Sequence, residues 1–186
     1  MKRLFDAAAS GAALLLLAIP LLTLAAVVRL TSPGPALHWS QRVGRHNVLF
    51  AMPKFRTMRT DTPDVATHEL AEPGRWITPL GRFLRRSSLD ELPQLWSVLV
   101  GHMSLVGPRP ALHSQADLIA LRTDAGVERL RPGVTGWAQV NGRDDLPIPE
   151  KVRLDAEYLA RRSFGFDLKI IAATALAAVT ARGVSH

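Results

Sequence analysis

The feature that most constrains this chain is an uncharged stretch near its start, which runs from Ala7 to Val28. Its centre reads AALLLLAIPLLTLAAVV, and a helix that crosses a bilayer needs about 20 apolar residues, so the stretch is long enough for one crossing. Pro20 lies in its middle, where a proline removes a backbone hydrogen bond and kinks a helix. A signal peptide, a transmembrane helix and a re-entrant membrane hairpin are the three structures that fit this pattern.

The basic residues on either side of the stretch discriminate among these three structures. Lys2 and Arg3 precede it, and Arg29, Arg42 and Arg45 follow it. No convincing small-x-small cleavage site precedes Arg29, which argues against a signal peptide. Positive residues mark the cytoplasmic side, so a single crossing would place one basic flank on the wrong face. The flanks therefore favour a hairpin bent at the proline, with a simple membrane anchor as the alternative.

The charge balance of the chain indicates anionic partners. It has 23 Lys and Arg residues against 16 Asp and Glu, and its pI is near 10.9. Nucleic acid, acidic lipid headgroups and nucleotide phosphates all fit such a balance. The absence of cysteine excludes disulfides, thiolate metal sites and a cysteine nucleophile. The six histidines show no spacing such as H-x-x-x-H, which argues against a zinc site.

The rest of the chain predicts a mostly α-helical fold with a few short β-strands. Residues 36–58 contain short apolar runs broken by Gly44 and Pro53, which predict brief extended segments. A short basic helix or turn is expected at 81–86, and longer helices at 111–130, 148–162 and 168–181. We therefore expect a membrane-embedded hairpin over residues 1–35 and one small cytosolic or interfacial domain over 36–186, with interfacial amphipathic helices.

The clearest predicted helix covers residues 89–100, where four apolar residues recur at helical spacing: Leu92, Leu95, Trp96 and Leu99. Pro93 is tolerated only in the first turn of a helix, so the helix should begin near Ser88 to Asp90. Ser88 and Glu91 also match the capping-box pattern. The acidic pair Asp90-Glu91 is thus predicted to lie at the positive end of a helix dipole.

This acidic pair is the strongest candidate for catalysis. It follows three arginines and precedes a proline-stiffened turn, Gly107-Pro-Arg109-Pro. Taken alone, two acids at a helix start most often only cap the helix. Among arginines, however, a carboxylate can attack a phosphoryl group to form an aspartyl-phosphate type of intermediate. A neighbouring acid can help to hold Mg²⁺, and arginines stabilise charge on the transferred group.

Three blocks of sequence, in this order, resemble the bacterial sugar transferases: KFRTM at 54–58, SLDELPQLWSVLVGHMSLVGPRP at 88–110 and RPGVTGWAQVNGR at 131–143. More narrowly, the chain is similar to the small monotopic phosphoglycosyl transferases. The resemblance extends from the N-terminal hydrophobic segment to DLKI at 167–170, which is nearly the whole chain.

The resemblance implies a two-step reaction at the cytoplasmic face of the bacterial inner membrane, which starts glycoconjugate or polysaccharide assembly. A carboxylate attacks the β-phosphate of a UDP-sugar and releases UMP, and a polyprenyl phosphate then accepts the enzyme-bound phosphosugar. By position, Asp90 would be the nucleophile and Glu91 would assist it. Both could be ligands of Mg²⁺, or Glu91 could act as an acid–base group. The basic positions expected at the phosphates and the nucleotide are Lys54, Arg85, Arg109 and Arg143. Membrane lipids are expected partners, nucleic acid is not, and a homodimer stays open.

One departure from the family and two alternatives remain. Relatives often carry a Ser-Pro pair in the re-entrant helix, whereas Ile19 precedes Pro20 here, so the hairpin prediction depends on the proline and the flanks. A membrane-anchored basic module that binds anionic lipid or nucleic acid without catalysis would need a basic stripe interleaved with aromatics, and the basic residues cluster around the acids instead. Polytopic sugar-phosphate transferases also use UDP-sugars and polyprenyl phosphate. They need many membrane spans, however, and the hydropathy of this sequence offers one or two. Larger relatives carry an extra multi-span domain ahead of this unit, and we expect the chain to be the minimal enzyme.

Overall fold

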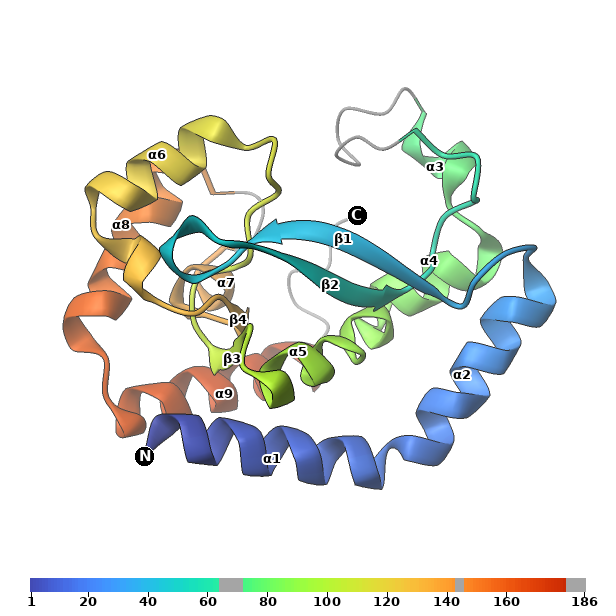
Figure 1. Cartoon of the computed structure of the whole chain (residues 1–186), viewed down its shortest axis with the longest axis horizontal. Helices are drawn as coiled ribbons and strands as arrows, with labels where there is room; N and C mark the ends of the chain where they lie inside the picture. The colour runs from blue at the N-terminus through green and yellow to red at the C-terminus, as the bar shows by residue number, and fades with distance from the viewer. Residues whose placement is uncertain (64–71, 143–145, 180–186) are drawn as a thin grey trace.

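The structure is a computed structural model that describes residues 1–63, 72–142 and 146–179, and Figure 1 shows its arrangement. It is mostly helical with a few short strands, as predicted. In chain order, with η for a 3₁₀-helix, the elements are α1 (Lys2–Leu16), α2 (Ala18–Thr31), β1 (Leu37–Val43), η1 (Arg45–Asn47), β2 (Leu49–Phe55), α3 (Pro73–Trp76), α4 (Pro79–Arg86), η3 (Leu89–Glu91), α5 (Gln94–Val100), β3 (Ser104–Val106), α6 (Ala116–Asp124), η4 (Val127–Arg129), β4 (Gly133–Thr135), α7 (Trp137–Val140), α8 (Ile148–Arg161) and α9 (Phe164–Val179).

The uncharged N-terminal stretch forms two helices, α1 and α2, which meet at an angle of 64°. The break lies at Leu17, and Pro20 explains its place. A proline offers no N–H to the carbonyl four residues earlier and its ring crowds that carbonyl, which here belongs to Leu16, the last residue of α1. In the described part of the chain no single helix is long and apolar enough to cross a membrane, whereas α1 and α2 together pass the same test of length and composition.

The outer face of this helix pair is apolar, and the fully buried residues of α1 are polar. Asp6 and Ser10 are buried against the rest of the molecule, and the Asp6 carboxylate accepts a hydrogen bond of 2.8 Å from the Ser104 hydroxyl. The outward side chains are between 71 and 85 % exposed: Leu4, Leu15, Leu16, Ile19, Leu22 and Leu30. Large apolar side chains that are exposed in a row along both helices mark a surface that contacts something apolar.

Polar contacts fix the start of α1 to elements from later in the chain. The Lys2 ammonium donates a hydrogen bond of 2.7 Å to the Asp167 carboxylate on α9. The Arg3 guanidinium donates to the carbonyls of Val98 and Leu99, both at 2.5 Å. These carbonyls lie in the last turn of α5, where the helix itself supplies no donor. As a result α1 runs along one side of the molecule beside α5 and α9 (Figure 1).

The strands β1 and β2 form an antiparallel hairpin across the middle of the molecule, which confirms the extended segments predicted for residues 36–58. Phe50 and Met52 on β2 are buried against Val98 and Met103. At the other end of β2, Phe55 packs in a cluster that also contains residues of α2 and α4. The hairpin therefore connects α2 to α4 and α5, the helices on either side of the acidic pair.

The remaining helices cover a two-stranded parallel sheet formed by β3 and β4. The predicted helix at 148–162 is confirmed as α8, and the predicted helix at 168–181 begins earlier, at Phe164. The helix predicted over 111–130 is wrong in extent, because α6 ends at Asp124 and Gly126 then adopts a left-handed φ of 71°. The short helix α7 was not predicted, and its Trp137 packs on Phe166 in the core with 5.1 Å between the ring centroids.

Candidate active site

The acidic pair lies on a tight turn rather than inside one continuous helix. The helix predicted over 89–100 is divided into η3 and α5, with Pro93 at the start of α5. The predicted capping box is wrong, because the Ser88 side chain makes no capping hydrogen bond and its backbone is left-handed, with φ 56°. A serine in that region is uncommon and such strain concentrates at functional sites.

Glu91 is surrounded by positive charge. Its carboxylate lies 2.7 Å from the Lys54 ammonium and 3.5 Å from the Arg109 guanidinium, and 22 % of its side chain is exposed. Burial alone would favour the neutral acid, but the charges of Lys54, Arg109 and Arg42 together lower the pKa of Glu91 to about 2. Glu91 is therefore a fixed carboxylate at physiological pH. Arg42 on β1 was not among the predicted site residues.

Asp90 has the opposite electrostatic character, although it is the next residue. It is 8 % exposed, and this burial raises the pKa of its carboxyl group. The charge of Lys54 opposes the rise, the charge of Glu91 adds to it, and Arg85 opposes it. A buried carboxylate of raised pKa is more basic and less solvated than an ordinary aspartate, and both properties favour nucleophilic attack. Two neighbouring acids in different environments commonly divide two roles between them.

Arg85 reaches Asp90 from α4, which packs closely against the segment that follows β2. A β-carbon added to Gly81 on α4 would lie 2.0 Å from the Thr57 carbonyl oxygen, so only glycine permits this approach. The Arg85 guanidinium donates a hydrogen bond of 2.9 Å to the Thr57 hydroxyl. Burial lowers the pKa of Arg85, and the charge of Asp90 counters this effect. Thr57 was missed as a site residue, although it lies within the KFRTM block that pointed to this region.

Arg56, in the same block, has a structural role. Its guanidinium donates hydrogen bonds to the backbone carbonyls of Ser32, Pro33 and Pro35 at 2.6 to 2.8 Å. It is buried, and these carbonyls belong to the turn that follows α2. The block therefore supplies Lys54 to the acidic pair and Arg56 to the base of the helix pair.

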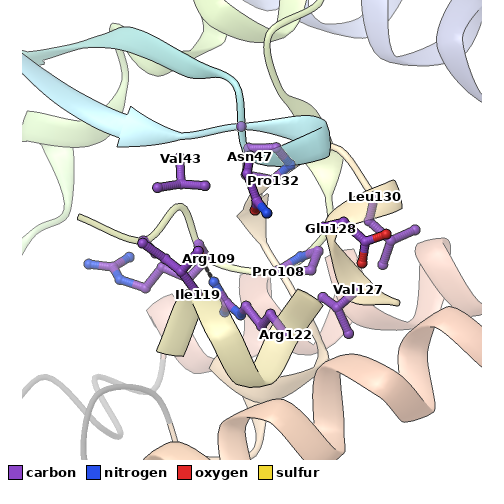
Figure 2. A pocket seen from close by; sticks show the side chains of 12 residues that line it. Val43, Asn47, Pro108, Arg109, Ile119, Arg122, Val127, Glu128, Leu130 and Pro132 are labelled. Carbon is purple, nitrogen blue, oxygen red and sulfur yellow. Dashed lines mark hydrogen bonds between the residues drawn. The ribbon is translucent and has the colours of Figure 1, made fainter. Parts of the chain in front are cut away.

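The Gly-Pro-Arg-Pro turn brings Arg109 to Glu91, and a residue of α6 binds the backbone of this turn. The Arg122 guanidinium on α6 donates a hydrogen bond of 2.8 Å to the Arg109 carbonyl, and Figure 2 marks this bond. Arg122 also forms an ion pair of 2.7 Å with Asp155 on α8, which is 1 % exposed. The cavity behind the turn has a volume of about 30 Å³, enough for a water molecule but not for a substrate.

Arg122 and Asp155 had no signal in the sequence. They are single charged residues 33 positions apart on two different helices, and nothing in their spacing connects them with residue 109. Their role is visible only once α6 and α8 pack together. Burial raises the pKa of Asp155, and the charge of Arg122 opposes that rise.

The structure thus brings together five of the predicted site residues, which are Lys54, Arg85, Asp90, Glu91 and Arg109. Arg143, predicted for the nucleotide, lies outside the described residues. Within the described ranges no group of three or more His, Asp or Glu side chains could hold a metal. Mg²⁺ is commonly held by one or two carboxylates together with substrate phosphates, so Asp90 and Glu91 are a donor set that suits it.

The chain matches a known protein family and several known proteins. The family described as bacterial sugar transferase matches residues 1–181. An uncharacterized sugar transferase, EpsL, of Bacillus subtilis is 41 % identical over the whole chain and 91 % of its own length. The UDP-glucose:undecaprenyl-phosphate glucose-1-phosphate transferase of Escherichia coli is 38 % identical over 92 % of this chain, and the undecaprenyl-phosphate galactose phosphotransferase of Salmonella typhimurium is 37 % identical over 94 %.

The chain spans only part of these last two relatives, 38 % and 40 % of their lengths. The match to the family nevertheless covers the helix pair, the hairpin and every predicted site residue. Because the family model matches nearly the whole chain, and EpsL is 41 % identical over all of it, the chain belongs to the bacterial sugar transferase family of enzymes.

Proposed function

We propose that this enzyme transfers a sugar 1-phosphate from a UDP-sugar to a polyprenyl phosphate, with release of UMP and through a covalent intermediate on Asp90. The observation that carries this proposal is the division of the acidic pair into a buried carboxylate of raised pKa and a fixed carboxylate paired with Lys54 and Arg109. The names of the E. coli and Salmonella relatives, which specify undecaprenyl phosphate and in one case UDP-glucose, support the two substrates.

In the first step an oxygen of the Asp90 carboxylate attacks the β-phosphorus of the UDP-sugar. The bond from that phosphorus to the oxygen bridging to the α-phosphorus breaks, and UMP leaves with the bridging oxygen. Arg85 and Lys54 lie close enough to Asp90 to act on its charge, so they are placed to bind the phosphoryl oxygens as negative charge moves. Arg109 and Lys54 lie beside the same oxygen of the Glu91 carboxylate.

In the second step an oxygen of the polyprenyl phosphate attacks the phosphorus of the bound phosphosugar. The phosphorus–oxygen bond to Asp90 breaks, the carboxylate is restored and a polyprenyl-diphosphate sugar is released. The acceptor is a membrane lipid, and the apolar outer face of α1 and α2 supports a membrane location for the enzyme. We place α1 and α2 in the inner membrane as a re-entrant hairpin, with the rest of the chain on the cytoplasmic face.

Mg²⁺ is the proposed cofactor, held by Asp90, Glu91 and the substrate diphosphate. Its chemistry there would be to neutralise charge on the diphosphate and the departing UMP. Glu91 suits this role because it stays ionised at any physiological pH. The same carboxylate orients Lys54 and Arg109 toward the site through its two ion pairs.

The nucleophile is tested by Asp90→Asn in the full-length protein with a panel of UDP-sugars and a polyprenyl phosphate. We expect UMP release to disappear while the variant stays folded and bound to membranes. Asp117→Asn, at an exposed position on α6, is the matched control and should keep activity. Turnover that persists in Asp90→Asn would remove Asp90 from the nucleophile role.

The topology is tested by cysteine labelling, because the chain has no native cysteine. A cysteine inserted after Met1 and the variant Pro33→Cys lie at the two ends of the helix pair, outside its outward apolar side chains, and Pro33 is exposed. The re-entrant hairpin predicts that an impermeant maleimide labels both positions from the cytoplasmic side of membrane vesicles. Labelling from opposite sides would show that the pair crosses the membrane.

A further inference from the structure

A second basic cavity lies at the start of α1, and the proposed reaction does not use it. Its volume is about 330 Å³, which is large enough for a phosphate-bearing headgroup. Six cationic side chains line it: Lys2, Arg3, Arg45, Arg129, Arg131 and Arg162. They come from α1, η1, η4, the segment before β4 and the end of α8, so the cavity forms only when these elements assemble.

Most of this positive charge is not matched by carboxylates. Lys2 pairs with Asp167, and Arg129 lies 3.5 Å from Glu128. Three guanidinium groups donate instead to backbone carbonyls: Arg3 to Val98 and Leu99, Arg45 to Arg129, and Arg131 to Gly101. Within residues 1–63, 72–142 and 146–179, no carboxylate forms an ion pair with any of these three arginines or with Arg162.

One carboxylate does line the cavity, that of Asp6. It is already engaged, since it accepts hydrogen bonds from the Ser104 hydroxyl at 2.8 Å and from the Leu105 amide at 3.4 Å. Against Asp6, the four arginines without an ion pair leave an excess of three positive charges facing one space. Guanidinium groups retain unused donors after bonding to carbonyls, and their planar fork suits phosphate oxygens.

The cavity is separate from the acidic pair. Arg3 and Arg131 bind carbonyls at the C-terminal end of α5, whereas Asp90 and Glu91 precede its N-terminal end. At 1.5 Å per residue, the seven residues of α5 place roughly 10 Å of helix between the two sites. The cavity lining contains neither acid, nor any of the four basic residues around them, which are Arg42, Lys54, Arg85 and Arg109.

Exposed apolar side chains lie on the two helices that the cavity residue Lys2 joins, α1 and α9. Leu4 follows Arg3 on the outer face of α1, and Phe164 and Leu168 on α9 are also exposed. Phe164 contacts Phe5 of α1 edge to face, with ring centroids 5.1 Å apart, so the two helices present one continuous apolar edge. Basic side chains beside an apolar edge are the pattern that binds acidic headgroups at a membrane surface.

We propose that this cavity binds the phosphate of an anionic membrane phospholipid, whose acyl chains lie along the exposed side chains of Leu4, Phe164 and Leu168. The lipid is a bilayer component that fixes the start of α1 at headgroup depth, and it is neither donor nor acceptor in the transfer reaction. The cavity should select lipids whose phosphate group has no compensating amine in the headgroup and is joined to apolar chains.

The test measures thermal unfolding of the full-length protein in detergent, followed by tryptophan fluorescence. The protein is titrated with short-chain phosphatidylglycerol, with short-chain phosphatidylcholine and with inorganic phosphate. The informative variant is Arg131→Gln with Arg162→Gln, which spares the bonds of Arg3 to α5. Arg75→Gln is the control, because it removes one exposed charge on α3, away from α1.

We expect phosphatidylglycerol to raise the unfolding temperature, and phosphatidylcholine and phosphate to have little effect. The double variant should bind phosphatidylglycerol roughly tenfold to thirtyfold more weakly, and Arg75→Gln should match the native chain. An equal response in the double variant would overturn the site, and an equal response to phosphate or phosphatidylcholine would overturn the lipid assignment. Asp90→Asn should keep the full response, which separates this result from the proposed transfer reaction.

Discussion

At the scale of single residues, the contrast between Asp90 and Glu91 has consequences for stability. The pKa of Asp90 is raised by burial, so its ionised form is less stable in the folded protein than in the unfolded chain. The pKa of Glu91 is lowered to about 2, so its ionised form is more stable in the folded protein. Neutral substitutions of these two neighbours should therefore change stability in opposite directions.

We predict that Asp90→Asn raises the unfolding temperature at pH 7 by a few degrees while it abolishes transfer, because it removes a buried charge. Glu91→Gln should lower stability by up to about 3 kcal/mol, since its pKa shift of between two and three units corresponds to about 1.4 kcal/mol per unit. Calorimetry of both variants measures these changes. Destabilisation by both would contradict the assignment of opposite environments.

The pH dependence of stability is an independent test of the sign of the Glu91 contribution. A lowered pKa contributes stability that is present above the unfolded pKa and is lost as the pH falls through the folded pKa. The difference in stability between the native chain and Glu91→Gln should thus close as the pH falls from about 4.5 to about 2. A constant difference over this range would show that the Glu91 charge does not contribute.

A second prediction concerns Lys54, the strongest of the charges that oppose the raised pKa of Asp90. Asp90 must be ionised to attack, so kcat/KM should fall as the pH drops through its pKa. Lys54→Met removes the opposing charge and should move this acid limb to higher pH, whatever it does to the maximal rate. Lys169→Met, at an exposed position on α9, is the control and should leave the limb in place.

At the scale of elements, the pair of helices α6 and α8 acts as a support for the turn that carries Arg109. Arg122 on α6 connects both helices to the turn, since it binds Asp155 on α8 and the Arg109 carbonyl. Removing one member of a buried ion pair leaves an uncompensated charge, which is worth about 3 to 5 kcal/mol, whereas replacing both with apolar residues is often neutral. Stability and positioning can therefore be separated at this site.

We predict that Asp155→Leu alone destabilises the protein by about 3 kcal/mol or more. Asp155→Leu with Arg122→Met should recover most of that stability but not the transferase activity, because the Arg109 carbonyl has lost its donor. The expected kinetic signature is a raised KM for the UDP-sugar with a smaller change in kcat. Full recovery of activity in the double variant would show that Arg122 supports only the fold.

The elements that the sequence predicted well are those whose burial is local. The extended segments around Phe50 and Met52, and the helix at 148–161, follow from apolar periodicity within one element. The capping box at Ser88 failed because the backbone of Ser88 is left-handed and its side chain makes no capping hydrogen bond. The acidic pair was identified from its motif, but its contact with Lys54 depends on a hairpin that brings residues 37 positions apart together.

At the scale of the whole molecule, the ion pair between Lys2 and Asp167 joins the first helix to the last. Asp167 is 3 % exposed and also accepts a hydrogen bond of 2.6 Å from the Tyr158 hydroxyl. This hydroxyl and the Lys2 ammonium are the partners that keep the carboxylate satisfied in the core. Burial of the Tyr158 hydroxyl, its hydrogen bond to Asp167 and the charge of that carboxylate raise the pKa of the tyrosine far above its usual range.

We predict that Lys2→Met lowers the stability of the protein by about 2 kcal/mol, because the buried Asp167 carboxylate loses the cation with which it forms an ion pair. Hydrogen exchange should increase over the first turns of α1 and over α9. Arg29→Met removes the same charge from an exposed position at the end of α2 and is the control. Unchanged exchange in α1 after Lys2→Met would place its anchorage elsewhere, at Arg3.

The same ion pair sets an order of events during synthesis. During synthesis Lys2 leaves the ribosome 165 residues before its partner, Asp167. At about 5 to 20 residues per second, the first helix exists for roughly 10 to 30 s before α9 has been made. The contacts of Arg3 with α5 and of Asp6 with Ser104 can form earlier in that interval, once α5 and β3 have been made. Of these polar contacts of α1, the ion pair with α9 is therefore the last that synthesis allows.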